Sequence, residues 1–85
     1  MGVTVTAAKE LAPFGIRVNA LSPVVESDMT AQMRPELRQE ALARVPLGRF
    51  GRPAEIAEGA LFLAGHRSSY ITGMVLHVDG GMHLY

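Results

Sequence analysis

The segment PAEIAEGALFLAGHRSSYITGMVLHVDGG, residues 53–81, decides the fold, because a helix signal and a strand signal follow one another in it. Its first part has apolar residues at the spacing of one helical face, namely Ile56, Ala60, Leu63 and Ala64. Pro53 suits the first helical position and Gly65 suits a helix end, so the pattern predicts a helix over 53–64. The apolar run that follows predicts a strand over 74–79.

A second strand signal lies upstream, at residues 16–22 (IRVNALS), where side chains alternate between two faces. Before it, a helix is predicted over 1–11, because apolar residues recur there in steps of four (Val3, Ala7 and Leu11). Residues 24–32 are predicted to form a loop. A further helix is predicted to begin at Pro35 and to end before Pro46.

The predicted order is helix, strand, two helices, strand, and it indicates an α/β protein. A strand followed by a helical crossover and a parallel strand is the repeating unit of such sheets. Two parallel strands alone do not make a stable sheet, because parallel sheets are normally covered on both faces. The 85 residues are therefore predicted to be part of one α/β domain.

The composition excludes several classes of function. Eight Lys plus Arg balance eight Asp plus Glu, so no net positive charge favours nucleic acid or an anionic membrane surface. There is no Cys, and therefore no disulfide framework or thiolate metal site. No stretch approaches the ~18–20 continuous apolar residues of a membrane span. These features predict a cytoplasmic protein.

Three runs of residues, in this order along the chain, resemble blocks of one known family. They are KELAPFGIRVNALSP (9–23), GRFGRPAEIAEGALFLA (48–64) and SSYITGMVLHVDGG (68–81). The chain is similar to the C-terminal part of short-chain dehydrogenases/reductases, above all those of the 3-oxoacyl-[acyl-carrier-protein] reductase type. The resemblance implies the C-terminal portion of a Rossmann-type doubly wound parallel sheet, with two parallel strands and about three helices in residues 1–85.

The resemblance also implies an NAD(P)-dependent oxidoreductase that reduces a 3-oxoacyl or similar carbonyl, on a small molecule or an acyl carrier protein. The family's catalytic Asn, Ser, Tyr and Lys lie earlier than the segment matched here. No Tyr precedes Tyr70, and Lys9, the only Lys, falls on the solvent side of its helix. We therefore expect no catalytic residue in this chain, and we expect the 85 residues alone to be inactive and to bind no cofactor.

One part of the family's cofactor site does fall within the chain. After the family's sixth strand, a Pro-Gly turn and a nearby Thr hydroxyl contact the nicotinamide carboxamide. Pro23, Val25 and Ser27 match those positions, so the resemblance implies that they contact NAD(P) in a complete enzyme. Val24 stands where the family has Gly, and a β-branched residue resists a positive φ. We therefore expect the backbone here to differ from the family's turn.

The histidines and the C-terminal polar residues support no second active site. His66, His77 and His83 are not spaced as a helical pair, and no metal site is predicted. A Ser22–His77–Asp79 triad can be drawn, but the sequence has no G-x-S-x-G turn that would present the serine. No catalytic triad is therefore predicted.

Three other features of the sequence are candidate binding sites: a glycine pair, two methionines and a set of arginines. Gly80–Gly81 is predicted to be a plain turn, because no helix long enough to hold a phosphate follows it. Met29 and Met33, near Leu37, either line an acyl pocket or pack in the interior. A set of arginines interleaved with glutamates predicts a solvated face: Arg34, Arg38, Arg44, Arg49 and Arg52.

Two alternatives to an oxidoreductase segment stay open. The apolar last strand and the helix over 53–64 are predicted to form an interface, so the complete protein is expected to be a homo-oligomer. On that basis the chain could be a non-enzymatic module that pairs with itself or with an intact relative. It could also be an unfolded peptide. Without the elements that cover one face of the sheet, the chain would lose several kcal/mol of stabilisation from buried apolar area, which is comparable to the whole stability of a small domain.

Overall fold

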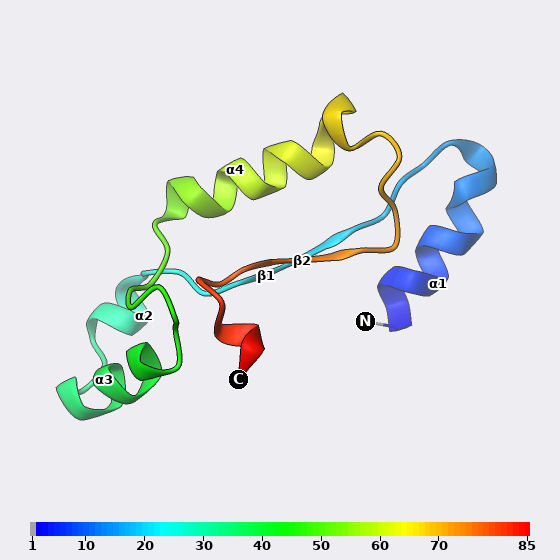
Figure 1. The fold of residues 1–85 in the computed structure, drawn as a ribbon. Coiled ribbons are helices and arrows are strands. Elements are labelled where there is room, and N and C mark those ends of the chain that lie inside the picture. The colour runs from blue at the N-terminus through cyan, green and yellow to red at the C-terminus, as the bar shows by residue number, and fades with distance from the viewer. Residues whose placement is uncertain (1) are drawn as a thin grey trace.

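The computed structural model describes residues 2–85 and shows an α/β arrangement (Figure 1). The helices are α1 (Gly2–Leu11), α2 (Asp28–Ala31), α3 (Pro35–Ala43) and α4 (Pro53–Ala64), and the strands are β1 (Ala20–Pro23) and β2 (Val75–Val78). Short 3-10 turns follow α1, α4 and β2, at Ala12–Phe14, His66–Ser68 and Met82–Leu84. The helix predicted over 1–11 is confirmed for the residues described, which do not include Met1.

The two strands form a parallel pair, as the sequence predicts. Ala20 lies opposite Val75 and Pro23 lies opposite Val78, so both strands end at the same edge of the sheet. The helix α4 runs along one side of the pair, and the C-terminal turn lies on the other side (Figure 1). The segments that directly follow the two strands therefore begin at the same end of the sheet.

The helix α4 has the predicted bounds and packs closely on the strands because a glycine lies at the contact. A Cβ added to Gly59 would lie 3.1 Å from Val78 Cγ2 and 3.6 Å from Leu21 Cδ2. Leu63, one turn further along, is buried. Of the face predicted from the apolar spacing, Leu63 is buried and Ile56 is half-buried, whereas Ala60 and Ala64 are exposed, so the prediction is confirmed only in part.

A buried serine ties the end of α4 to the chain that leads into β1. Ser68 is 1% exposed, and its Oγ donates to Phe62 O at 2.8 Å and accepts from Arg17 Nη1 at 3.0 Å. Arg17 also donates to the carbonyls of Gly65 and Ile71. The guanidinium thus partners a carbonyl group that the end of a helix leaves free.

The predicted strand over 16–22 is wrong at its start, because β1 begins at Ala20. Upstream of that point, Val18 N donates to Thr72 Oγ1 at 3.0 Å, and Met74 N donates to Asn19 Oδ1 at 3.0 Å. Side-chain oxygens therefore replace part of the backbone ladder. The second strand is likewise one residue shorter at each end than the predicted 74–79.

The predicted loop over 24–32 is also wrong, because it contains the single-turn helix α2. Ser27 is its N-cap: Ser27 Oγ accepts from Thr30 N at 3.3 Å, and Ser27 N donates to Thr30 Oγ1 at 2.7 Å. This reciprocal pair satisfies backbone groups that a helix start leaves free, and it stabilises the turn. The helix α3 begins at Pro35 and ends before Pro46, as predicted.

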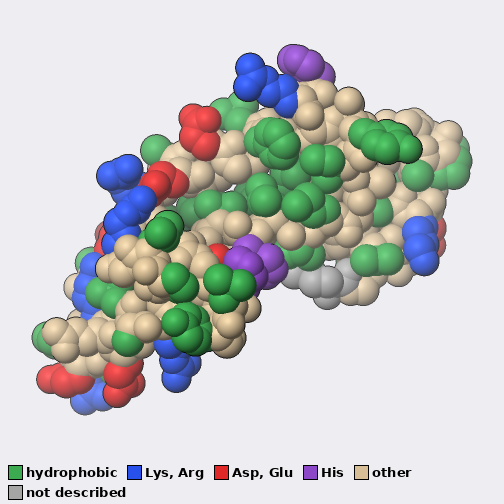
Figure 2. Space-filling model, in the orientation of Figure 1, with side chains coloured by type: hydrophobic (Ala, Val, Ile, Leu, Met, Phe, Trp, Pro, Cys, Tyr) green, Lys and Arg blue, Asp and Glu red, His purple; other side chains and the backbone are tan. Residues whose placement is uncertain are grey.

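The chain is less compact than a self-contained domain of its length. Its radius of gyration is 15.3 Å, whereas about 12 Å is typical of a domain of this length. Large apolar side chains remain exposed on α1, on α4 and at the C-terminal end, among them Val3, Leu61, Phe62, Leu84 and Tyr85. Figure 2 shows apolar side chains gathered over α4 and the strands. Within residues 2–85, no helix is long and apolar enough to cross a membrane.

Candidate functional site

The residues predicted to contact a cofactor lie at the carboxyl edge of the sheet, directly after β1. Val24 N donates to Val78 O at 3.1 Å, which continues the strand pairing beyond Pro23. Gly51 N donates to Val24 O at 3.0 Å, and Glu26 N donates to Gly51 O at 2.8 Å. The segment after β1 is therefore fixed both to β2 and to the loop that precedes α4.

The backbone polar groups of Val25 are left free by this arrangement. Val25 pairs with Gly51 as an isolated bridge, in which the hydrogen bonds come from the residues on either side of Val25. Its own N–H and C=O make no hydrogen bond within residues 2–85. Val24 is accommodated without backbone strain, because no non-glycine residue among those described has a positive φ. One donor and one acceptor are thus available at this edge.

Ser27 adds a hydroxyl to these groups. Its oxygen accepts from Thr30 N, but its hydrogen has no acceptor among the described residues. Pro23 and Ser27 are exposed and Val25 is half-buried. The structure therefore brings the three predicted residues onto one accessible segment that offers two donors and an acceptor.

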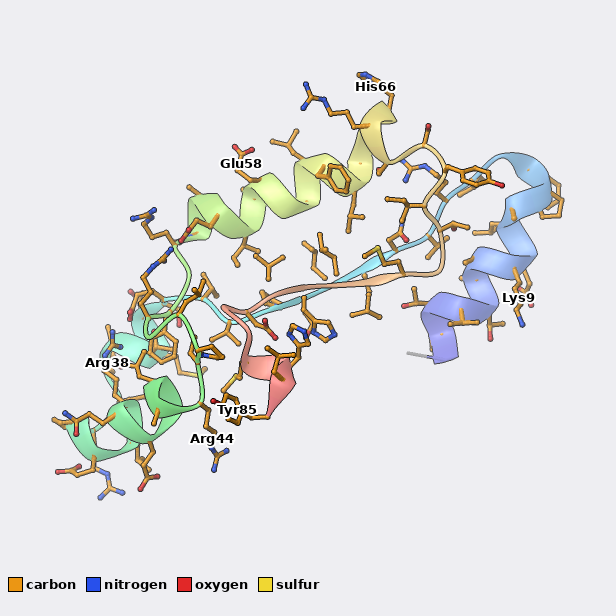
Figure 3. All side chains as sticks on the ribbon, in the orientation of Figure 1. Lys9, Arg38, Arg44, Glu58, His66 and Tyr85 are labelled. Carbon is orange, nitrogen blue, oxygen red and sulfur yellow. The ribbon has the colours of Figure 1, made fainter. Side chains whose placement is uncertain are left out.

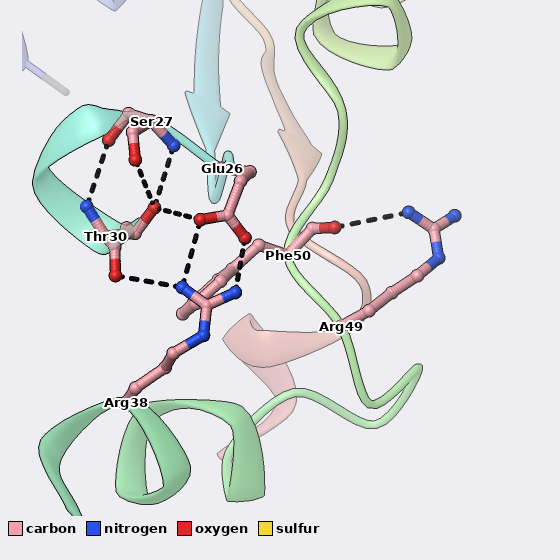
Figure 4. Close-up of polar contacts among 6 residues, drawn as sticks. All are labelled: Glu26, Ser27, Thr30, Arg38, Arg49 and Phe50. Carbon is pink, nitrogen blue, oxygen red and sulfur yellow. Dashed lines mark hydrogen bonds and ion pairs between the residues drawn. The ribbon is translucent and has the colours of Figure 1, made fainter. Parts of the chain in front are cut away.

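An ion pair that the sequence did not predict holds this segment against α3 (Figure 4). Arg38 donates to both carboxylate oxygens of Glu26, at 3.0 Å for Nη1 to Oε1, and to Thr30 O at 2.9 Å. Its guanidinium carbon lies 4.9 Å from the ring centroid of Phe50, which is buried. The hydrogen bonds from Arg38, and then from Thr30, lower the pKa of Glu26 from 4.5 to about 2. The pair is therefore charged at neutral pH.

A cleft of about 470 Å³ opens at the same edge of the sheet. Part of its lining is an ion pair of 2.8 Å between Arg49 and Glu55. Hydrogen bonds from Arg49, and then from the backbone of Arg52, lower the pKa of Glu55 to about 2. The full lining is Pro46, Leu47, Arg49, Gly51, Glu55, His77, Val78, Asp79, Gly80, Gly81 and His83. The carboxyl edge is where open α/β sheets bind their ligands.

The cleft also contains a histidine–aspartate cluster that sequence spacing did not reveal. His77 Nδ1 lies 3.7 Å from Asp79 Oδ2, and His83 Nδ1 lies 3.0 Å from Asp79 Oδ1. The two imidazole rings stack, with centroids 4.2 Å apart. Burial opposes ionisation of Asp79, but hydrogen bonds from the His83 ring and from the N–H groups of Gly81 and His83 together outweigh it, so its pKa is lowered.

The other residues that the sequence singled out lie outside this arrangement. Lys9 points away from the strands on α1, as predicted (Figure 3). Met29 is 80% exposed, so it is not an interior packing residue of this chain, whereas Met33 is half-buried. Ser22 lies opposite His77 in the strand register, yet the histidine closest to Asp79 is His83, so the drawn triad is not formed.

A parallel strand pair, a crossover helix on one side and free polar groups at the carboxyl edge define part of a Rossmann-type α/β domain. The family model described as enoyl-(acyl carrier protein) reductase matches residues 1–83. The chain therefore belongs to this family of short-chain dehydrogenases/reductases, and both the predicted fold class and the predicted family are confirmed.

Individual relatives agree with this assignment. The chain is 52% identical to the 3-oxoacyl-[acyl-carrier-protein] reductase FabG of Thermotoga maritima over 83 residues. The match covers 96% of this chain and 34% of the relative. The chain is also 46% identical to FabG of Staphylococcus aureus over 85 residues, and this match covers 99% of this chain and 35% of the relative. A crystal structure of a Thermus thermophilus protein matches with a TM-score of 0.92 at 46% identity, covering 99% of this chain and 36% of that one. The chain thus spans about a third of the length of the relatives it matches.

Proposed function

We propose that these 85 residues are the carboxyl-terminal part of an NAD(P)-dependent reductase of fatty acid biosynthesis, acting on a 3-oxoacyl or similar carbonyl carried by an acyl carrier protein. Two observations support the proposal: the FabG relatives are named 3-oxoacyl-[acyl-carrier-protein] reductases, and the backbone N–H and C=O of Val25 and the hydroxyl hydrogen of Ser27 are free at the carboxyl edge. The second observation carries it. The free groups lie at the carboxyl edge, where open α/β sheets bind their ligands, so they are placed to receive the polar groups of one.

The residues present fit a nicotinamide carboxamide. Such a group has one carbonyl acceptor and one NH₂ donor, and Val25 offers a free N–H and a free C=O. Ser27 offers a hydroxyl hydrogen, and exposed Pro23 offers an apolar surface beside them. When bound, the nicotinamide supplies the hydride that reduces the carbonyl carbon. Pro23, Val25 and Ser27 would orient that ring, and the Glu26–Arg38 pair would keep their segment in place.

The groups that would act on the substrate carbonyl itself are assigned to parts of the enzyme outside this chain. None of the described residues offers the Tyr and Lys pair that the family uses, and Lys9 faces away from the site. We therefore expect the isolated 85-residue chain to oxidise no NADPH and to bind none saturably. Isothermal titration calorimetry of NADPH into the chain measures the binding, and a saturable isotherm would contradict the expectation.

A chimera tests the proposed role of the segment. The first two thirds of the Thermotoga maritima reductase would be joined to this chain at the start of the matched region, and NADPH oxidation with a 3-oxoacyl substrate would be followed. The chimera is expected to turn over. Ser27→Ala is expected to raise KM for NADPH about 2- to 12-fold, the equivalent of one hydrogen bond of ~0.5–1.5 kcal/mol.

The matched control is Ser69→Ala, another exposed serine, whose side chain makes no hydrogen bond within residues 2–85. This variant is expected to leave KM unchanged. An inactive but folded chimera would overturn the proposal, and so would equal KM values for the Ser27 and Ser69 variants.

A second candidate function is a non-enzymatic module that pairs with an intact relative. The exposed apolar side chains of α4 and of the C-terminal end favour it, since Leu61 is 66% exposed and Tyr85 is 84% exposed. Co-expression with a full-length FabG relative, followed by size-exclusion chromatography, tests this function. Co-elution of the two chains supports it, and separate elution rules it out.

A further inference from the structure

The cluster of His77, Asp79 and His83 has the donor groups and the proximity of a metal site. One ligand atom from each residue lies within 4.8 Å of the other two. The residues reach one another because the chain reverses after β2 at Gly80 and Gly81, whose φ values are +61° and +94°. His77 then comes from the strand and His83 from the turn that follows it, so their approach is a property of the fold.

The carboxylate of this cluster is held in place before any ligand arrives. The Asp79 side chain is 6% exposed, and its two oxygens accept hydrogen bonds of 3.0 Å from Gly81 N and His83 N. Backbone groups therefore fix the carboxylate, and its remaining lone pairs face the imidazole of His83, whose Nδ1 lies 3.0 Å from Oδ1 and 3.1 Å from Oδ2. The imidazoles are more accessible, with side-chain exposures of 39% for His77 and 41% for His83. A cation can reach the cluster from solvent and meet a preorganised oxygen ligand there.

The surroundings do not oppose a cation. Arg49, the positively charged residue of the cleft lining, is neutralised by its ion pair with Glu55. The described residues of the lining include no lysine. Two imidazoles and one carboxylate form a donor set that zinc accepts with a fourth position open, and imidazole ligands select transition metals over magnesium or calcium.

We propose that His77, Asp79 and His83 form a three-ligand site for one transition-metal ion of the Zn²⁺ type, open to the cleft at its fourth position. To direct one nitrogen of each ring at the ion, the two imidazoles would rotate out of their stack, and His83 would exchange its hydrogen bond with Asp79 for the metal. The site is separate from the segment proposed to hold the nicotinamide, so its existence does not depend on that function.

Zinc binding by the 85-residue chain tests the site, and His66 provides the control. His66 is an exposed histidine in the turn after α4, on a different element from the cluster (Figure 3). Isothermal titration calorimetry with Zn²⁺ is expected to show one equivalent bound. His77→Ala and His83→Ala are each expected to lower the affinity at least ~10-fold, since even outer-shell partners of a metal contribute that much. His66→Ala is expected to leave the affinity unchanged.

A structural readout separates ligation from loss of folding. In a two-dimensional NMR spectrum, Zn²⁺ is expected to shift the ring C–H resonances of His77 and His83 and to leave those of His66 in place, while Mg²⁺ shifts none of them. Far-UV circular dichroism of the variants checks that they keep their helices. Absence of saturable Zn²⁺ binding overturns the proposal. It is equally overturned if folded His83→Ala binds as tightly as the unchanged chain.

Discussion

Replacement of Gly80 by alanine tests whether the turn after β2 is fixed by its neighbours. Gly80 has a φ of +61°, and a left-handed backbone costs a residue with a Cβ ~1–2 kcal/mol. An alanine Cβ would also lie 2.7 Å from Val45 Cγ1, which is far closer than ordinary contact. Val45 is buried and has little room to move, and overpacking of this kind costs ~1–3 kcal/mol. The expected total loss of unfolding free energy is ~2–5 kcal/mol.

Gly48→Ala is the matched control for this prediction. Gly48 has a φ of +76°, and nothing lies within 4 Å of an added Cβ, so only the backbone cost applies. Urea unfolding of both variants, followed by far-UV circular dichroism, measures the difference. Gly80→Ala is expected to lose ~1–3 kcal/mol more than Gly48→Ala. Equal losses in the two variants would refute the argument that Val45 and the turn constrain one another.

Three further predictions concern the site and its support. The pKa of Glu26 is lowered from 4.5 to about 2, so the stability that its pair with Arg38 contributes is present above pH ~4.5 and is lost as the pH falls toward ~2. In Arg38→Ala, the pKa of the Glu26 carboxyl, measured by NMR titration, is expected to return toward 4.5. An unchanged pKa would contradict the pairing. Gly59→Ala is expected to lower the free energy of unfolding by ~1 kcal/mol, because overpacking of the new Cβ against Val78 at 3.1 Å exceeds the gain in helix propensity. A variant that is stabilised in urea unfolding would show that β2 can move to make room. Ser68→Ala is expected to lower the free energy of unfolding by ~1–3 kcal/mol, since it removes the hydroxyl of a residue that is 1% exposed, which donates to Phe62 O and accepts from Arg17. A smaller loss in the same assay would contradict a structural role for this hydroxyl.

The elements that the sequence predicts well are those whose signals are local. The bounds of α4 follow from Pro53, from Gly65 and from an apolar repeat over three turns, and all three signals lie within the helix or next to it. The parallel pairing of β1 and β2 follows from the same logic, because a helical crossover joins them. By contrast, α2 is too short to show any apolar repeat, and only the Ser27–Thr30 capping pair marks it.

The site is less predictable because its contacts depend on how separate elements meet. Pro23, Val25 and Ser27 could be named from a family resemblance, but the freedom of the Val25 backbone depends on the bridge to Gly51, which lies on the far side of α2 and α3 in the sequence. The approach of His77 and His83 depends on the turn between them, and ring stacking has no sequence signature. Spacing rules for helical ligand pairs do not describe such a turn.

The ion pair between Glu26 and Arg38 has a similar explanation. Its residues lie in different elements, so a rule for neighbours on one helix does not find it. The sequence predicts Arg38 as one of several solvated arginines, whereas in the structure it lies over Phe50 and pairs with Glu26. A glutamate directly before a helix cap, with an arginine in the next helix, is the signal that could have indicated the contact.

A crystal structure of the chimera with NADP⁺ bound tests the central claim most directly. The account predicts that the nicotinamide carboxamide lies within hydrogen-bonding distance, ~2.7–3.2 Å, of the backbone N–H or C=O of Val25 and of the hydroxyl of Ser27. A folded complex in which the carboxamide contacts neither residue would contradict the account, because the free groups at this edge would then need another explanation.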